Sequence, residues 1–212
     1  MPTFPRYSPL RFVLVLLVLG LTSAYAGVVT FEDLPDAYFF NGGGQNIGAF
    51  YAGLTFGPNV TGLSVSRFGG YANAAFPPHS GDVVIWDATD STVAIDFASS
   101  IQSFGIWYTS FDPFTLQAFD QNGDLIGTVV GNPNTDGTTG ASSLLSFSGA
   151  GVWSVNLTSS PGLYVLDDLA FTPELVSQTP EPSTFLALLT GLSIIGRFRV
   201  RRSLTRILKP LE

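Results

Sequence analysis

The sequence of 212 residues contains no cysteine, and this absence excludes a disulfide framework, a thiolate metal site and a cysteine nucleophile. It contains a single histidine, His79, which leaves little scope for proton transfer by imidazole or for zinc ligation. Charged residues make up only 12% of the chain, about half of the share typical of soluble proteins. With 45% hydrophobic residues, the chain is nevertheless too apolar to be disordered.

Basic residues are almost absent from the middle of the chain. Of the nine Lys and Arg residues, two precede the first hydrophobic run and six follow the last one, so that Arg67 is the only one between residues 27 and 179. The same stretch holds fourteen Asp and Glu residues, which gives it a net charge of −13. We do not expect so acidic a domain to bind nucleic acid, because phosphates require basic partners.

The N-terminus has the three parts of a secretory signal peptide in their usual order. Two arginines precede the apolar run FVLVLLVLGL, and small residues follow at Ala24 and Ala26 around one tyrosine. This arrangement predicts a signal peptide over residues 1–26, cut by signal peptidase so that the mature chain begins at Gly27. The rest of the chain is then expected to be exported across the inner membrane.

A second uncharged run, FLALLTGLSIIG, lies near the C-terminus. As a helix its twelve residues span about 18 Å, which is short for a hydrocarbon core of about 30 Å. A basic cluster follows at once: Arg197, Arg199, Arg201 and Arg202. An apolar helix followed by arginines predicts a single transmembrane helix that stops transfer, with residues 203–212 as a cytoplasmic tail.

The same C-terminal segment begins with Pro180, Glu181 and Pro182, followed by Ser-Thr, the short apolar run and the arginines. This combination over residues 180–202 resembles the PEP-CTERM sorting signal of Gram-negative, polysaccharide-producing bacteria. The resemblance implies that an exosortase recognises and processes the tail, so that the protein is anchored transiently and then lies at the cell surface or outside the cell. Residues 174–179 are predicted to be a linker before this signal. The alternative is that Pro-Glu-Pro is itself only a linker before an ordinary anchor helix.

Residues 27–173 show the period-two alternation of β-strands and no sustained helical periodicity. Alternation places hydrophobic residues on one face of a strand in two sets, namely Val93, Ile95 and Phe97, and Phe104, Ile106 and Tyr108. A third strand is expected to place one set of side chains, Val152, Ser154 and Asn156, opposite another, Trp153, Val155 and Leu157. Asn122-Gly123 predicts a tight hairpin turn. About ten such strands predict an all-β fold, an antiparallel two-sheet sandwich of the jelly-roll type.

The same domain resembles the β-sandwich ectodomains that are commonly attached to PEP-CTERM tails. The resemblance rests on the order of the strings VVTFEDLP, FYAGLTF, SFGIWY, FDQNGDLIG and LDDLAF along the chain. It implies a fold like that of carbohydrate-binding modules, although a fold does not determine a function.

A structural calcium ion is one candidate feature of this domain. The first and last strands of a jelly roll lie near each other, so Glu32 and Asp33 are expected near Asp168. Carboxylate oxygens on a strongly acidic domain suit calcium. The alternative is that these residues face solvent or that Asp168 caps a loop.

Aromatic residues offer a second candidate, because exposed rings can stack on the faces of sugars. The candidates are Trp86, Trp107, Tyr108, Trp153 and Tyr164. The alternative is that they point inward and pack in the core.

Catalysis is not expected, since His79 lies in a loop beside Pro78 and Ser80, where a solvated side chain is the simpler interpretation. No G-x-S-x-G motif accompanies it, and nothing marks a pair among the carboxylates.

The sequence therefore indicates an exported cell-surface or extracellular-matrix protein of the biofilm or exopolysaccharide, with a non-catalytic β-sandwich. The alternative is a carbohydrate-binding module for the cell's own polysaccharide, and a glycoside hydrolase is a distant third.

Overall fold

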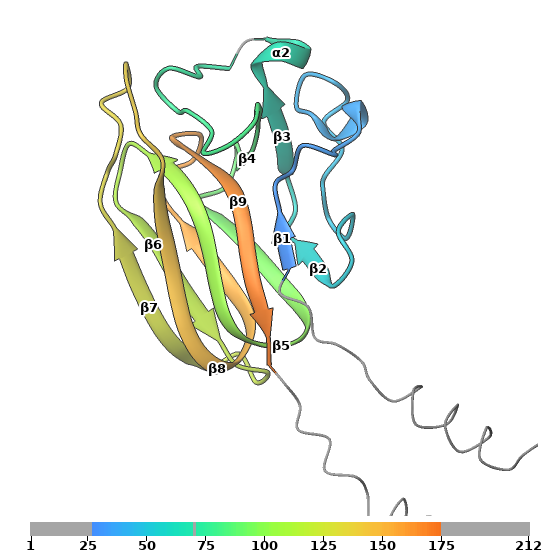
Figure 1. The fold of residues 1–212 in the computed structure, drawn as a ribbon, viewed down its shortest axis with the longest axis vertical. Coiled ribbons are helices and arrows are strands. Elements are labelled where there is room, and N and C mark those ends of the chain that lie inside the picture. Colours follow the sequence, from blue (N-terminus) through green and yellow to red (C-terminus); the bar gives the residue numbers. More distant parts are fainter. Residues whose placement is uncertain (1–26, 70, 175–212) are drawn as a thin grey trace, which may run out of the picture. The chain divides into compact units, whose positions relative to one another are not determined.

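The computed structural model describes residues 27–69 and 71–174, which form nine strands and two short helical turns (Figure 1). The strands are β1 (Gly27–Val29), β2 (Leu54–Phe56), β3 (Val60–Ser64), β4 (Val83–Asp87), β5 (Thr92–Ser110), β6 (Phe114–Phe119), β7 (Leu125–Gly131), β8 (Ser143–Thr158) and β9 (Tyr164–Pro173). The helical turns are η1 (Asp36–Tyr38) and α2 (Val65–Phe68). No helix within these described residues has the length and hydrophobicity that crossing a membrane requires. The predicted signal peptide, sorting signal and transmembrane helix lie outside them.

Two long strands, β5 and β8, bend and contribute to both layers of the fold. Residues 92–96 of β5 pair with residues 154–158 of β8, while residues 103–108 pair with residues 143–148. One layer therefore contains β3, β4, β9, the second half of β5 and the first half of β8, with β1 beside β9. The other contains β2, the first half of β5, the second half of β8, β6 and β7. Every pairing between these strands is antiparallel, which confirms the predicted antiparallel β-sandwich.

The predicted alternation holds along β5 and fails along β8. Both predicted hydrophobic sets of β5 are buried between the layers. In β8, however, Val152 and Val155 are both fully buried, although they are three positions apart and strict alternation would place them on opposite faces of the strand. The strand changes layers here, just after Gly151 at φ 76°, so the predicted alternation holds for Val155 and Leu157, which are buried, and is wrong at Val152.

The turn predicted at Asn122-Gly123 joins β6 to β7, as expected, with Gly123 at φ 82°. The loop is longer than a two-residue hairpin. Asp120 Oδ1 organises it by accepting hydrogen bonds from the backbone N–H groups of Asn122 (2.8 Å) and Asp124 (2.9 Å).

Strand β4 is buried on both of its faces, and this feature places the candidate site. Val83 and Ile85 point into the main core between the layers. Val84 belongs to a second cluster, with Leu63 of β3 and Val165 of β9. Because successive side chains of a strand point to opposite faces, this second cluster lies on the outer face of the layer.

Arg67 of α2 fastens the segment between β1 and η1 to the rest of the layer. Its Nη1 donates a hydrogen bond to the carbonyl oxygen of Leu34 at 2.7 Å, and its Nη2 donates to that of Glu32 at 2.8 Å. The guanidinium carbon lies 4.8 Å from the centre of the Phe39 ring. By contrast, Asp36 is an exposed partner at 4.0 Å. The carbonyl bonds therefore stabilise the fold more than the ion pair does.

We expect Arg67→Ala to lower the free energy of unfolding by about 2 kcal/mol, because two carbonyl groups lose a charged donor. Asp36→Ala is the matched control and should change it by less than about 0.5 kcal/mol. Denaturant titrations of the two variants measure both values. Equal losses in the two variants would show that the ion pair is the stabilising contact.

Candidate functional site

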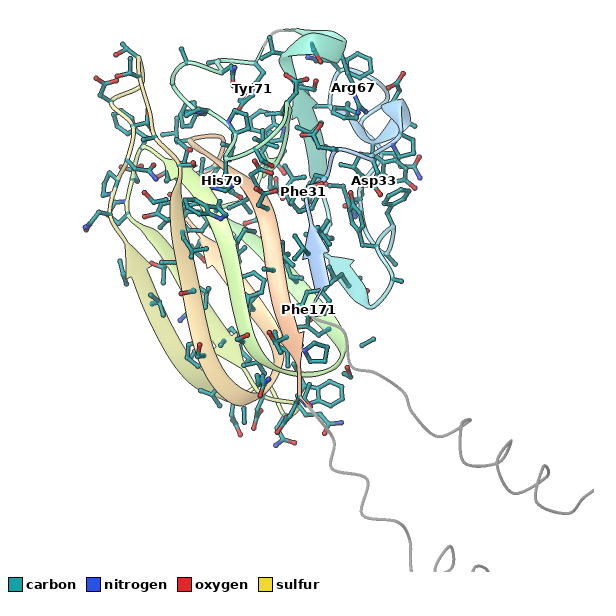
Figure 2. All side chains as sticks on the ribbon, in the orientation of Figure 1. Phe31, Asp33, Arg67, Tyr71, His79 and Phe171 are labelled. Atoms are coloured by element: carbon teal, nitrogen blue, oxygen red, sulfur yellow. The ribbon has the colours of Figure 1, made fainter. Side chains whose placement is uncertain are left out.

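The connection between α2 and β4, of which the structure describes Gly69 and residues 71–82, covers the outer hydrophobic cluster. It brings Tyr71 and Phe76 onto that cluster, where they pack with Trp86 of β4. Figure 2 shows Tyr71 and His79 on this connection, toward the end of the sandwich where α2 lies. The backbone N–H of Gly140 also donates to the carbonyl oxygen of Ala74 at 3.0 Å, which ties the connection to a neighbouring loop.

The buried carboxylate of Asp167 anchors the end of this connection to β9. Its Oδ2 accepts hydrogen bonds from the backbone N–H groups of His79 (2.7 Å) and Ser80 (2.9 Å). Its Oδ1 accepts from the N–H of Asp168 at 2.7 Å. Asp168 adopts a φ of 41°, in the left-handed region that is unfavourable for a residue other than glycine.

Asp168 binds the same connection through its side chain. One carboxylate oxygen lies 2.6 Å from His79 Nδ1, and the other accepts a hydrogen bond from Ser80 Oγ at 3.0 Å. The imidazole also stacks on the indole of Trp107, with ring centres 3.5 Å apart and planes 13° from parallel. His79 is thus an exposed loop residue, as expected, and its ring is in addition held on two sides.

A pocket of about 280 Å³ opens beside the outer cluster. Its lining residues are Phe40, Asn41, Leu63, Tyr71, Ala72, Phe76, Trp86, Gly162, Tyr164 and Val165. None of these ten residues is charged, and five are aromatic: Phe40, Tyr71, Phe76 and Trp86 bring four side chains to one place, while the ring of Tyr164 packs in the main core. Such a cavity lies near the lower end of the range of about 300–1,000 Å³ typical of small-molecule sites, so it suits a ligand of one or two rings.

The rim and the polar groups of the pocket come from different segments. Phe40 keeps 52% of its surface exposed and lies edge-on to Trp86, with ring centres 5.5 Å apart. The Trp86 indole nitrogen Nε1 is enclosed and has no hydrogen-bond partner among the described residues. The hydroxyl of Tyr71 donates to the carbonyl oxygen of Phe76, and the exposed side-chain amide of Asn41 donates from Nδ2 to the carbonyl oxygen of Gly69 at 3.4 Å. The pocket thus combines aromatic surface with a few polar groups.

Burial sets the electrostatics of the anchor. It raises the pKa of Asp167 to about 6, against the opposing effect of the backbone N–H donors of Ser80, Asp168 and His79. Burial likewise raises the pKa of the Tyr71 hydroxyl, and the nearby charges of Asp167 and Asp82 raise it further.

The aromatic residues predicted to bind sugar divide between the pocket and the core. Trp86 lines the pocket, and Trp107 lies under His79. Tyr108 and Tyr164 pack their rings on Phe114 within the main core, as the inward-facing alternative expected, although Tyr164 also borders the pocket. Trp153 of β8 is partly exposed and does not line the pocket.

The three predicted calcium ligands lie near the paired strands β1 and β9 but bind protein groups. Glu32 Oε1 accepts from the backbone N–H groups at positions 82 and 83, both at 2.8 Å. Asp33 Oδ1 accepts from the hydroxyl of Tyr51 at 2.7 Å, and Asp168 holds His79 and its neighbour. Over residues 27–69 and 71–174 there is no group of three or more acidic or histidine side chains suited to hold a metal ion. A structural calcium ion stays a prediction.

The surroundings of His79 do not form a serine-hydrolase relay. Asp168 does orient the imidazole through Nδ1, as the acid of a triad would. The neighbouring Ser80, however, donates its hydroxyl to Asp168 instead of to the imidazole. His79 and Asp168 therefore act as an anchor for the connection in this structure.

Sequence reasoning missed Phe40, Tyr71 and Phe76 as lining residues. Each lies in a stretch rich in glycine, asparagine or proline, within YFFNGGG or GGYANAAFPP. Aromatic residues in such turns do not belong to a strand that would bury them in the core. Their presence in these turns is the signal that could have identified them as lining residues.

No protein-family model and no curated protein matches the chain. Among solved structures, it is similar to the module CsCBM6-3 from Clostridium stercorarium in complex with cellobiose, with 17% identity, a TM-score of 0.37, and coverage of 70% of this chain and 94% of that one. It is also similar to a fucose-binding module from Streptococcus pneumoniae, with 15% identity, a TM-score of 0.34, and coverage of 54% and 90%. Similarities at these low TM-scores carry no argument about function, so the function is argued below from the residues of this chain alone.

The raised pKa of Asp167 predicts a pH-dependent contribution to stability. The native state binds this proton more tightly than the unfolded chain, whose aspartates titrate near 3.8, so this contribution falls as pH rises from about 4 to about 6. Relative to Asp167→Asn, the wild-type free energy of unfolding should therefore fall by roughly 1–3 kcal/mol across this window.

Denaturant titrations of the purified chain between pH 4 and pH 7 measure this difference. The exposed Asp124→Asn is the charge-matched control and should keep the wild-type pH profile. Parallel profiles for the wild type and Asp167→Asn would contradict the prediction.

Proposed function

We propose that the protein is an exported, non-catalytic β-sandwich that binds a carbohydrate in the aromatic pocket on the outer face of β3, β4 and β9. From the resemblance of the C-terminus to a sorting signal, the proposal also includes processing of the C-terminus by an exosortase. The domain then works at the cell surface or in the extracellular matrix. Polysaccharide made by the same cell is the natural ligand for a protein in that location.

The observation that carries the proposal is the gathering of four aromatic side chains around one uncharged pocket of about 280 Å³. Sugar rings present apolar C–H faces that pack on aromatic rings, and hydroxyl groups that need hydrogen-bond partners. The amide of Asn41 offers such a partner at the rim.

These aromatic residues do not serve the main core. The interior of the sandwich is filled from the other faces of the same strands, by side chains such as Val83, Ile85 and Leu166. Phe40 is half exposed and lies edge-on to Trp86 at the pocket, where a bound ligand would cover it.

Several features of the pocket favour binding over hydrolysis. Glycoside hydrolysis uses two carboxyl groups that flank the scissile bond. None of the ten lining residues is an aspartate, a glutamate or a histidine. The carboxylates of Asp167 and Asp168 are engaged by the connection that forms the pocket wall.

Binding is tested by a glycan array and by titration calorimetry on the full-length chain, purified in a detergent that has no sugar headgroup. We expect Phe40→Ala to weaken carbohydrate binding about tenfold or more, because an exposed aromatic ring at the rim of the site is lost. Phe111→Ala is the matched control, since Phe111 is 45% exposed and does not line the pocket. Equal affinity in the two variants would place the ligand elsewhere.

Processing is tested separately. We expect the mature protein to start at Gly27 and to lack residues 197–212, because both ends carry cleavage signals. Mass spectrometry of the surface form measures both ends, and peptides from SLTRILKPLE in that form would contradict the proposal. Glu181→Ala should leave the protein in the inner membrane.

A further inference from the structure

We infer that the aromatic pocket takes a neutral sugar unit and discriminates against one that carries a carboxylate or sulfate. The inference rests on the proposed function, because it specifies which class of carbohydrate the pocket binds. It follows from the negative charges close to the pocket. It also follows from Arg67, the only Lys or Arg between residues 27 and 179, which does not line the pocket.

The wall formed by Tyr71 has two carboxylates close to it. The charges of Asp167 and Asp82 raise the pKa of the Tyr71 hydroxyl, after the larger effect of burial. Asp167 follows the lining residue Val165 by two positions along β9, so its side chain lies on the same outer face, where it binds the connection that carries Tyr71. Asp82 ends that connection and accepts a hydrogen bond from Ser64, which follows the lining residue Leu63. An anionic ligand beside Tyr71 would meet the same negative potential.

Both carboxylates are ionised at neutral pH. Burial acts to raise the pKa of Asp82, but hydrogen bonds from Ser64 and Ser66 outweigh it and lower the pKa overall. The pKa of Asp167 is about 6, so this group also carries its charge above that pH. The negative potential at the pocket is therefore present under physiological conditions.

The basic groups nearby are already engaged with protein atoms. Arg67, the only Lys or Arg between residues 27 and 179, donates to the carbonyl oxygens of Leu34 and Glu32. His79 lies 2.6 Å from the carboxylate of Asp168. Neither residue lines the pocket, so the lining offers no cation to an anionic sugar.

Screening by salt makes the charges close to the pocket more important for ligand selectivity than the net charge of the whole domain. Charges more than about 8 Å apart interact weakly in solution at physiological ionic strength. The net charge of −13 therefore contributes less than the two partly buried carboxylates beside Tyr71. Replacing one of these two groups should consequently change the selectivity more than replacing a distant exposed one.

The test compares matched ligands that differ only in a CH₂OH group or a carboxylate, such as glucose and glucuronate oligosaccharides, or galactose and galacturonate oligosaccharides. Calorimetry on the full-length chain should give an affinity for the neutral member at least about tenfold higher than for its uronate. This ratio should shrink as the ionic strength rises. The comparison on the unmodified chain decides the inference by itself.

Equal or tighter binding of the uronates would overturn the inference and leave the proposed function in place. Absence of binding to any neutral or anionic glycan would overturn the proposed function, and the inference with it. Asp82→Asn should raise uronate affinity severalfold without changing neutral affinity, whereas the exposed, distant Asp124→Asn should change neither. Unchanged uronate affinity in Asp82→Asn, with neutral binding retained, would also contradict the inference.

Discussion

The buried carboxylate of Asp167 is the contact on which the candidate site depends. It accepts three backbone N–H groups and thereby fixes the end of the connection from residue 69 to residue 82 against β9. That connection brings Tyr71 and Phe76 over the outer face of β4. Burying a carboxylate is unfavourable unless its oxygens are hydrogen-bonded, and here the backbone of the connection supplies the donors.

A second constraint comes from β4, which is hydrophobic at consecutive positions. A strand with one face in solvent would alternate, but Val83, Val84 and Ile85 are all fully buried. The connection must therefore cover the outer face of the layer. The pocket lies where this cover is incomplete, between Phe40 and Trp86.

The sequence predicted the sandwich well because alternation is a local property. The hydrophobic faces of β5 and the hairpin at Asn122-Gly123 follow from neighbouring residues and from turn chemistry. The crossing of β8 between layers could not be predicted in this way. Its change of phase near Gly151 depends on how two layers are joined, which single-strand alternation does not encode.

The site was less predictable, because its residues come from segments far apart in the chain. Trp86 was identified from its residue type alone, while Tyr108 and Tyr164, chosen on the same grounds, pack in the core. The acidic residues near β1 and β9, which the sequence offers as calcium ligands, accept hydrogen bonds from protein groups, and calcium binding stays a prediction. Asp168 illustrates the reason, since its partner His79 lies 89 positions away.

The most direct measurement is a crystal structure of the full chain with a neutral oligosaccharide selected by the glycan array. The account predicts that a sugar ring packs against Phe40 and Trp86, while Asp167 still accepts the backbone N–H groups of the connection. A sugar bound at another surface, such as beside Trp153 on β8, would contradict it.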